Sequence, residues 1–168
     1  FKLSDTLNIS KGEAESLIEK YFSAFPNIKD FLERLGHYGK RNGYITTMPP
    51  FKRRRWFDSW YPKIWNDRTM MGELGSIERA SKNTPIQGSS ADMTKLALIY
   101  IYDEIQANWK GDVKIVMTVH DQIDTICKQE KAEEWAPTMT ALMEKAAMKI
   151  VKNGLLKADT NISKTWEK

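Results

Sequence analysis

The stretch VKIVMTVHDQIDTICK, residues 113–128, decides how the second half of this chain is expected to fold. Two runs rich in β-branched and apolar residues, 113–119 and 122–128, stand on either side of His120 and Asp121. Runs of this kind around a two-residue gap predict a strand, a tight turn and a second strand. The prediction is therefore a β-hairpin with a histidine and an aspartate at its tip.

The hairpin raises the question of why a carboxylate stands at its tip. Almost no charge occurs from Ile115 to Ile123, so we expect buried strands and an Asp121 that emerges from an apolar base. A rigid base suits a metal ligand, although aspartate is also an ordinary turn former. His120 and Asp121 are too few for a closed zinc site, whereas Asp121 with oxygen ligands from elsewhere suits Mg²⁺. Strict alternation divides the first strand into two faces, Val113, Ile115, Met117 and Val119 on one, and Val116, Thr118 and His120 on the other.

Helical periodicity accounts for most of the first part of the chain. Ser10 and Glu13 form a capping-box pattern at the start of one helix, and Pro26 ends that helix. A second helix is predicted over about 27–40, and the residues YITTM at 44–48 predict a short strand. The second helix is expected to bury its apolar side chains, Ile28, Phe31, Leu32 and Leu35.

Residues 49–68 lack clear periodicity and are rich in proline, arginine and aromatic residues, so we expect a long loop. Its basic run, KRRR at 52–55, is either a solvated loop or a contact for a polyanion. The aromatic residues are expected to anchor the loop by packing, and a stacking platform for bases is the alternative. These residues are Trp56, Trp60, Tyr61 and Trp65.

A long helix is predicted from about 75 to 108, with an interruption near Pro85 and Gly88. A final helix is predicted over about 131–152, and 155–163 predicts one more strand at an edge of the sheet. The later half of the long helix has one apolar face, formed by Met93, Leu96, Ala97, Tyr100 and Ile101.

The earlier half of the long helix carries a polar stripe. Arg79, Asn83 and Gln87 recur every four residues, which on a continuous helix places them on one face. A guanidinium and two amides suit hydrogen bonding to a polar ligand, and a solvent-facing stripe is the plain alternative.

The totals limit the class of protein. Of 168 residues, 41% are hydrophobic and 29% are charged, which indicates a globular rather than a disordered chain. No apolar run approaches the roughly 18 residues that would suggest a membrane span. The single cysteine, Cys127, excludes an intramolecular disulfide and favours a reducing compartment. The net charge of +4 is a weak indication of a nucleic-acid partner. The missing initiator methionine suggests a fragment or a processed piece.

The order of these segments resembles family A DNA polymerases, the group that includes bacterial DNA polymerase I. RASKNTPIQGSSADMTKLAL, residues 79–98, is similar to their long R-x-x-x-N-x-P-x-Q-G motif, and VHDQI, residues 119–123, resembles their third catalytic motif. GYITTM with KRRRW resembles their arginine loop, and the segment 7–32 is similar to the helices that precede it. ISKTWEK, residues 162–168, resembles their C-terminal end, so the likeness covers nearly the whole chain.

The resemblance implies a role for each matching residue. Asp121 matches the catalytic aspartate, a ligand of the metal ions that position the primer 3′ end and the incoming dNTP. His120 and Gln87 match residues near the primer terminus, and Arg79 and Asn83 match neighbours that contact template and primer. The three arginines of the loop, Arg53, Arg54 and Arg55, would lie near the DNA backbone. The implied cofactor is Mg²⁺, and the implied partners are primer–template DNA and dNTP.

Three features depart from the family pattern. Gln122 stands where the family usually has glutamate, so any metal-tuning role of that acid is lost. Lys52 stands where glycine is usual, in a longer loop. The chain also begins after the strand that supplies the second carboxylate and after the helix that contacts the triphosphate. Two-metal phosphoryl transfer needs at least two carboxylates, so the chain alone is expected to be inactive and to need the upstream part of the polymerase.

The sequence therefore predicts an α+β fold, with the second half of a fingers subdomain at 1–75 and the C-terminal part of a palm subdomain at 76–168. The palm portion would contain the long helix, the catalytic hairpin, the final helix and the edge strand. A non-enzymatic DNA-binding module and a structural subunit that completes a split polymerase remain alternatives. The expected location is the cytoplasm of a bacterium or of a phage-infected host, with no membrane partner, and the unusual motif fits a phage or another mobile replicon.

Overall fold

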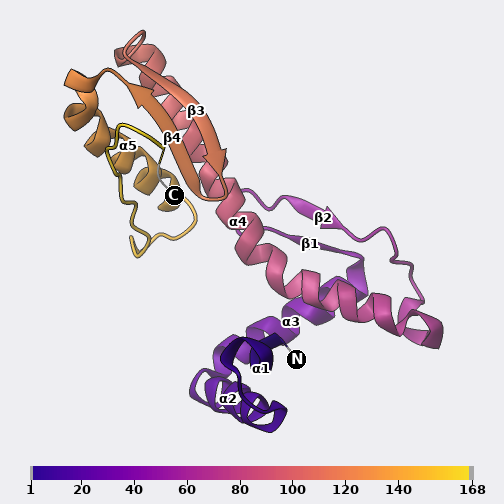
Figure 1. Ribbon diagram of the computed structural model, residues 1–168. Coiled ribbons are helices and arrows are strands. Elements are labelled where there is room, and N and C mark those ends of the chain that lie inside the picture. Colours follow the sequence, from indigo (N-terminus) through magenta and orange to yellow (C-terminus); the bar gives the residue numbers. More distant parts are fainter. Residues whose placement is uncertain (1, 167–168) are drawn as a thin grey trace. The chain divides into compact units, whose positions relative to one another are not determined.

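A computed structural model describes residues 2–166, and Figure 1 shows the order of their helices and strands. The fold is α+β, as predicted: the described residues are mainly helical, with two two-stranded sheets, β1–β2 and β3–β4. The chain divides into two compact units, Phe1–Ile45 with Arg55–Lys82, and Thr46–Arg54 with Asn83–Lys168. Within the part that the structure describes, no helix is long and apolar enough to cross a membrane.

The first unit begins with three helices, α1 (Lys2–Leu7), α2 (Lys11–Ala24) and α3 (Pro26–Asn42). The predicted capping box is confirmed. The Ser10 hydroxyl accepts from the backbone N–H of Glu13 at 3.2 Å, and the Glu13 carboxylate accepts from the N–H of Ser10 at 2.9 Å. These two bonds satisfy donors that a helix start otherwise leaves free.

The buried side of α3 differs from the prediction. Ile28 is 40% exposed, and Phe31, Leu32 and Leu35 are only partly covered. The buried residues are Gly36 and Gly39, which face the segment Glu78–Lys82 of α4 (Met71–Asn108). A Cβ on Gly39 would collide with the Ser81 hydroxyl, so glycine lets α3 approach α4 closely at this point.

The segment expected to be a long loop contains regular structure. β2 (Arg54–Trp56) pairs with β1 (Tyr44–Thr46), and two 3₁₀ turns follow, η1 (Ile64–Asn66) and η2 (Arg68–Met70). Among the aromatic residues, Trp60 is anchored: its indole N–H donates to the Lys40 carbonyl at 2.8 Å, and its ring lies against Gly43. Trp56 packs its ring against that of Tyr44, with 4.9 Å between the ring centroids, although it is 60% exposed. Trp65 is 50% exposed.

The long helix α4 is continuous through Pro85 and Gly88, so the predicted interruption is wrong. A proline inside a helix removes one backbone hydrogen bond. The helical turns before and after Pro85 are packed against other parts of the chain. Ser81 is fully buried, and Thr84 and Ser89 are also buried. This tertiary contact outweighs the local cost of the proline.

The predicted hairpin is confirmed, with one correction. β3 (Val113–Val119) and β4 (Gln122–Cys127) are antiparallel, and His120 and Asp121 form the turn. The register shifts between Ile115 and Met117, so Val116 is an extra residue in a β-bulge. The bulge reverses the alternation, and Met117 and Val119 therefore do not share a face with Val113 and Ile115, as strict alternation predicted.

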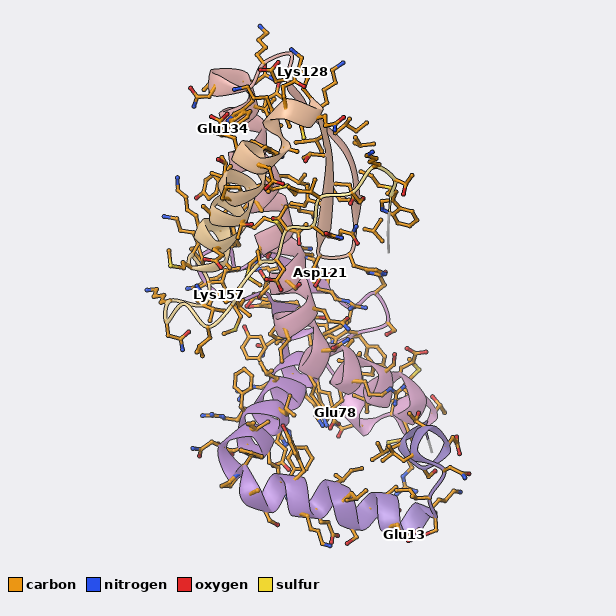
Figure 2. The ribbon with its side chains drawn as sticks, turned by 60° about the vertical axis from the view of Figure 1, so that its left-hand side comes forward. Glu13, Glu78, Asp121, Lys128, Glu134 and Lys157 are labelled. Carbon is orange, nitrogen blue, oxygen red and sulfur yellow. The ribbon has the colours of Figure 1, made fainter. Side chains whose placement is uncertain are left out.

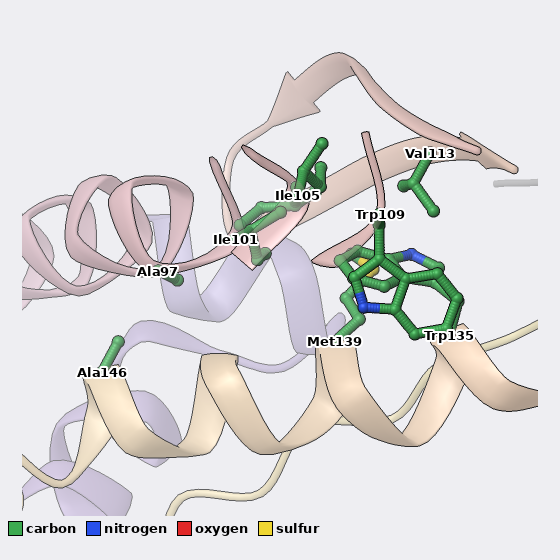
Figure 3. Packing of buried hydrophobic residues seen from close by; sticks show 9 residues of the cluster. Ala97, Ile101, Ile105, Trp109, Val113, Trp135, Met139 and Ala146 are labelled. Atoms are coloured by element: carbon green, nitrogen blue, oxygen red, sulfur yellow. The ribbon is translucent and has the colours of Figure 1, made fainter. Parts of the chain in front are cut away.

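The core of the second unit lies between the later half of α4, the covered face of the hairpin and α5 (Ala132–Ala147). Figure 3 shows the rings of Trp109 and Trp135 in contact, with Met139 beside them. The predicted apolar face of α4 is confirmed by Ala97 and Ile101, which are buried in this cluster. The final helix is shorter than the predicted 131–152.

The predicted edge strand at 155–163 is absent from the described residues. This segment has no regular structure and is held by side chains instead. The hydroxyls of Thr140 and Thr160 are 2.6 Å apart, and the Glu144 carboxylate accepts from the Lys157 ammonium at 3.3 Å. Side-chain contacts to α5 thus replace the backbone pairing that the strand prediction required.

Candidate functional site

The hairpin tip exposes Asp121. Its neighbour His120 has a left-handed backbone with φ 57°, which closes the two-residue turn, and Figure 2 shows Asp121 at this end of the hairpin. The strands below are not buried on both sides as predicted: Val116 and Ile126 are 55% and 63% exposed. Only the face that carries Val113 and Ile123 is covered, so the apolar base under Asp121 is one-sided.

Gln122 and Asp124 form a pair on the other face of β4. The Gln122 side-chain N–H₂ donates to Asp124 Oδ1 at 2.7 Å, and the two residues stand opposite Val119 and Met117. Asp124 Oδ2 is buried, and within residues 2–166 it has no hydrogen-bond partner. The amide of Gln122 is therefore tied to a carboxylate two residues further along the same strand face.

Asp121, Gln122 and Asp124 also line a groove of about 1500 Å³ in the second unit. Its other walls come from α4, α5 and the segment after α5. Within the described part of the chain, no group of three His, Cys, Asp or Glu side chains is close enough together to hold a metal ion. The described residues thus place carboxylates on a groove without forming a group of three metal ligands.

The predicted polar stripe lies on α4. Arg79, Asn83 and Gln87 are all exposed, and the Asn83 side-chain N–H₂ donates to Gln87 Oε1 at 2.7 Å. Because α4 continues through Pro85, the spacing of four residues keeps its helical meaning. The stripe presents amide and guanidinium groups to solvent rather than to the core.

The basic loop is attached to α4 through two α4 residues that the sequence did not single out, Ser89 and Asp92. Arg53 Nε donates to Asp92 Oδ1 at 3.0 Å, and the Met48 N–H donates to the Ser89 hydroxyl at 2.8 Å. Asp92 was missed because its partner lies 39 residues away in sequence. The only signal was an aspartate on the apolar part of a helix. Arg54 and Arg55 are exposed.

A charged cluster in the first unit joins α3 to α4. The ammonium groups of Lys40 and Lys82 each lie 2.6 Å from a carboxylate oxygen of Glu78, which Figure 2 labels. Hydrogen bonds from Lys40 first, and then from Lys82, lower the pKa of Glu78 to about 2. The cluster is a structural link, and it lies apart in sequence from the hairpin carboxylates.

Comparison with known proteins tests the resemblance to family A DNA polymerases. The model of the family described as DNA polymerase family A matches residues 1–168. The chain belongs to DNA polymerase family A. DNA polymerase I of Bacillus caldotenax is 32% identical over 166 residues, and that of Streptococcus pneumoniae is 34% identical over the same number. Both alignments cover 99% of this chain and 18% of the relative.

The thermostable DNA polymerase I of Thermus thermophilus is 31% identical over 145 residues, which are 86% of this chain and 16% of that protein. The chain thus spans less than a fifth of the length of these family A relatives. Their names state the activity of proteins more than five times as long. What this chain contributes to such an activity is argued below from its own residues.

Proposed function

We propose that this chain is the C-terminal fingers and palm portion of a DNA-directed DNA polymerase. In the complete enzyme it takes part in template-directed nucleotidyl transfer to a primer 3′ end. The observation that carries the proposal is Asp121, an exposed carboxylate on a two-residue turn in a chain of this family. Rigid strands on both sides hold such a carboxylate in one place, which positioning of reacting groups requires.

In this proposal the polar side chains that match the family's motifs bind DNA. His120 stands next to Asp121 at the tip, and Gln87 and Asn83 are exposed on α4 within the same unit. Amides and a guanidinium such as that of Arg79 can bind sugar, phosphate and the minor-groove acceptors that all base pairs share. Contacts of this type test the geometry of a base pair without reading its sequence. Arg53, Arg54 and Arg55 supply positive charge for the DNA backbone.

The residues present fit one side of a Mg²⁺ site. Asp121 is a suitable oxygen ligand, and Asp124 has a buried oxygen without a hydrogen-bond partner in the described chain. Within the described residues these carboxylates do not belong to a group of three His, Cys, Asp or Glu side chains that could hold a metal ion, so the proposal takes the remaining ligands from another part of the polymerase. When bound, Mg²⁺ would neutralise charge on the transferring phosphoryl group. Asp121 would hold one edge of that site.

The two alternatives predict different behaviour of the isolated chain. A non-enzymatic DNA-binding module binds primer–template DNA without any requirement for Asp121. A structural subunit that completes a split polymerase has apolar surface that a partner covers, and the exposed Val116 and Ile126 on the hairpin favour this second candidate. Strong binding of an apolar dye by the isolated chain supports the structural subunit.

Primer extension with Mg²⁺ and four dNTPs tests the catalytic proposal. The purified chain alone is expected to extend no primer, because its described residues have no group of three side chains that could hold a metal ion. Adding the upstream part of the polymerase is expected to restore extension, and Asp121→Asn is expected to abolish it. Extension that survives Asp121→Asn would contradict the role of Asp121.

A further inference from the structure

The basic loop packs against Gly88, Ser89 and Asp92 of α4, and these three residues are called the socket below. All residues of this contact belong to the second unit, which contains Thr46–Arg54 and Asn83–Lys168. A Cβ on Gly88 would lie 2.7 Å from the Thr47 methyl group, so only glycine lets the loop come this close. The Ser89 hydroxyl accepts from the Met48 N–H at 2.8 Å and donates to the Pro85 carbonyl at 2.5 Å.

The socket also fixes the backbone of Arg53. The Arg53 N–H donates to the Thr47 hydroxyl at 3.0 Å, and the Thr47 N–H donates to the Arg53 carbonyl at 2.9 Å. Thr47 is only 2% exposed. The position from which the Arg53 side chain starts is therefore set by buried contacts.

The ion pair between Arg53 and Asp92 is asymmetric. The Asp92 side chain is 7% exposed, whereas that of Arg53 is 52% exposed. Asp92 Oδ1 accepts from Arg53 Nε at 3.0 Å, and Asp92 Oδ2 is buried without a hydrogen-bond partner in residues 2–166. The buried carboxylate thus depends on Arg53 for compensation, while the guanidinium still reaches solvent.

The guanidinium has donors beyond those that the socket takes. Of its five N–H groups, one on Nε binds Asp92 and one on Nη2 lies 3.5 Å from the Gly88 carbonyl. The planar group can therefore be held at one edge and bind a phosphate oxygen at the other. A pre-oriented guanidinium loses less freedom on binding than a mobile one.

We propose that Asp92 is a positioning residue that, with Gly88 and Ser89, holds Arg53 so that its outer edge binds a phosphate of the primer–template DNA. This inference rests on the proposed DNA-binding function. It assigns the later part of the QGSSAD segment, residues 87–92, to orienting the basic loop. Asp92 itself does not touch DNA.

The direction in which Asp92→Asn changes DNA affinity distinguishes a positioning role from a purely electrostatic effect. Asp92→Asn removes a negative charge close to Arg53, so charge alone predicts tighter DNA binding. Positioning predicts weaker binding, because the guanidinium loses its orientation. The control is Asp103→Asn, an exposed aspartate further along α4 that removes the same charge without touching the socket.

The experiment measures binding of the full chain to a fluorescent primer–template duplex by anisotropy over a series of NaCl concentrations. We expect Asp92→Asn to weaken DNA binding about 3- to 10-fold and to reduce the slope of log K against log salt by about one. The same two effects are expected of Arg53→Ala. The double variant is expected to bind DNA no more weakly than Arg53→Ala alone, because both substitutions remove the same contact between Arg53 and a phosphate. Asp103→Asn is expected to bind as tightly as the unmodified chain or slightly tighter.

A second readout keeps the test independent of folding. Circular dichroism identifies variants that remain folded, and Arg53→Lys replaces Asp92→Asn if the latter unfolds. Lysine keeps the charge but lacks the planar second edge, so it is also expected to weaken binding. In ¹⁵N spectra, the Nε–H resonance of Arg53 is expected to shift when Asp92→Asn breaks the ion pair.

The outcomes separate this inference from the proposed function. Tighter or unchanged binding of folded Asp92→Asn, or unchanged binding of Arg53→Lys where Asp92→Asn unfolds, overturns the positioning role, provided that Arg79→Ala still lowers the salt slope. Independent and additive effects of Arg53→Ala and Asp92→Asn overturn it as well. A chain that shows no salt-dependent DNA binding at all overturns both.

Discussion

Gln122 is hydrogen-bonded to a carboxylate of its own strand. The resemblance to the family led us to expect an acid at position 122; Gln122 stands there, and its amide donates at 2.7 Å to Asp124, two residues further along the same strand face. An ionised carboxylate only accepts hydrogen bonds, so the N–H₂ of Gln122 must face Asp124. The local arrangement is therefore suited to one acid and one amide, and it disfavours two acids.

This pair predicts that restoring the family's acid is harmful. Gln122→Glu places two carboxylates within hydrogen-bond distance, which destabilises the fold by about 1–2 kcal/mol at pH 7. Gln122→Glu with Asp124→Asn exchanges the two roles and is expected to recover most of that loss. Urea denaturation measures both variants. Gln129→Glu, an exposed control, is expected to change the free energy of unfolding by less than about 0.5 kcal/mol, and an equally harmless Gln122→Glu would contradict the account.

Glu78 predicts a pH dependence of stability. Its pKa is 4.5 in the reference state and about 2 in the fold, because Lys40 and Lys82 bind the ionised form. A lowered folded pKa contributes stability that is full above pH 4.5 and is lost as the pH falls from 4.5 to about 2. The side chain is 34% exposed, so solvent screening reduces this contribution to about 1 kcal/mol.

The measurement compares free energies of unfolding at pH 6 and pH 3. Glu78→Gln is expected to lose less stability between these values than the unmodified chain. Glu33→Gln, on the exposed side of α3, is the matched control and is expected to follow the unmodified chain. Identical pH profiles for Glu78→Gln and the unmodified chain would show that the two lysines do not stabilise the ionised carboxylate.

At the scale of elements, the close approach of α3 to α4 depends on glycine. A Cβ at position 39 would collide with the buried Ser81 hydroxyl, which is held by a 2.7 Å hydrogen bond to the Ile77 carbonyl. The Phe57 ring also lies close to Gly39, 3.3 Å from where a Cβ would be. The helix pair is thus sensitive to small changes in volume.

Gly39→Ala is therefore expected to destabilise the chain by about 1–3 kcal/mol despite the better helix propensity of alanine. Gly12→Ala is the matched control, because nothing lies within 4 Å of its Cβ, and it is expected to stabilise α2 by up to about 1 kcal/mol. Thermal unfolding of both variants decides the point. A stabilising Gly39→Ala would mean that the two helices are free to separate.

At the scale of the whole molecule, the features that the sequence predicted correctly are local. The capping box at Ser10 and the hairpin around Asp121 are formed by residues close together in sequence, and the types of these residues are sufficient to predict the local geometry. The bulge at Val116 was not predictable, because one extra apolar residue in an apolar strand leaves no mark in composition. The partner of Asp92 was hidden by distance along the chain, and the predicted edge strand at 155–163 was replaced by side-chain contacts.

The same limit applies to the site. The carboxylate at the hairpin tip is exposed as predicted. The stripe lies on one continuous helix and is exposed, which fits both of the alternatives that the sequence left open, a ligand-binding stripe and a solvent-facing one. The stripe was predicted despite the expected interruption at Pro85. The exposed outer face of the hairpin was not predicted, because apolar residues such as Val116 and Ile126 normally indicate burial. Apolar surface of this kind is consistent with a chain that spans less than a fifth of its relatives.

In the proposed function, these 168 residues supply the hairpin carboxylate of a polymerase active site. Primer extension tests this role in a chimera in which this chain replaces the 166 aligned residues of Bacillus caldotenax DNA polymerase I. We expect Mg²⁺-dependent extension that Asp121→Asn abolishes and that Asp103→Asn leaves unchanged. A folded, DNA-binding chimera that extends no primer, or one whose extension survives Asp121→Asn, would contradict it.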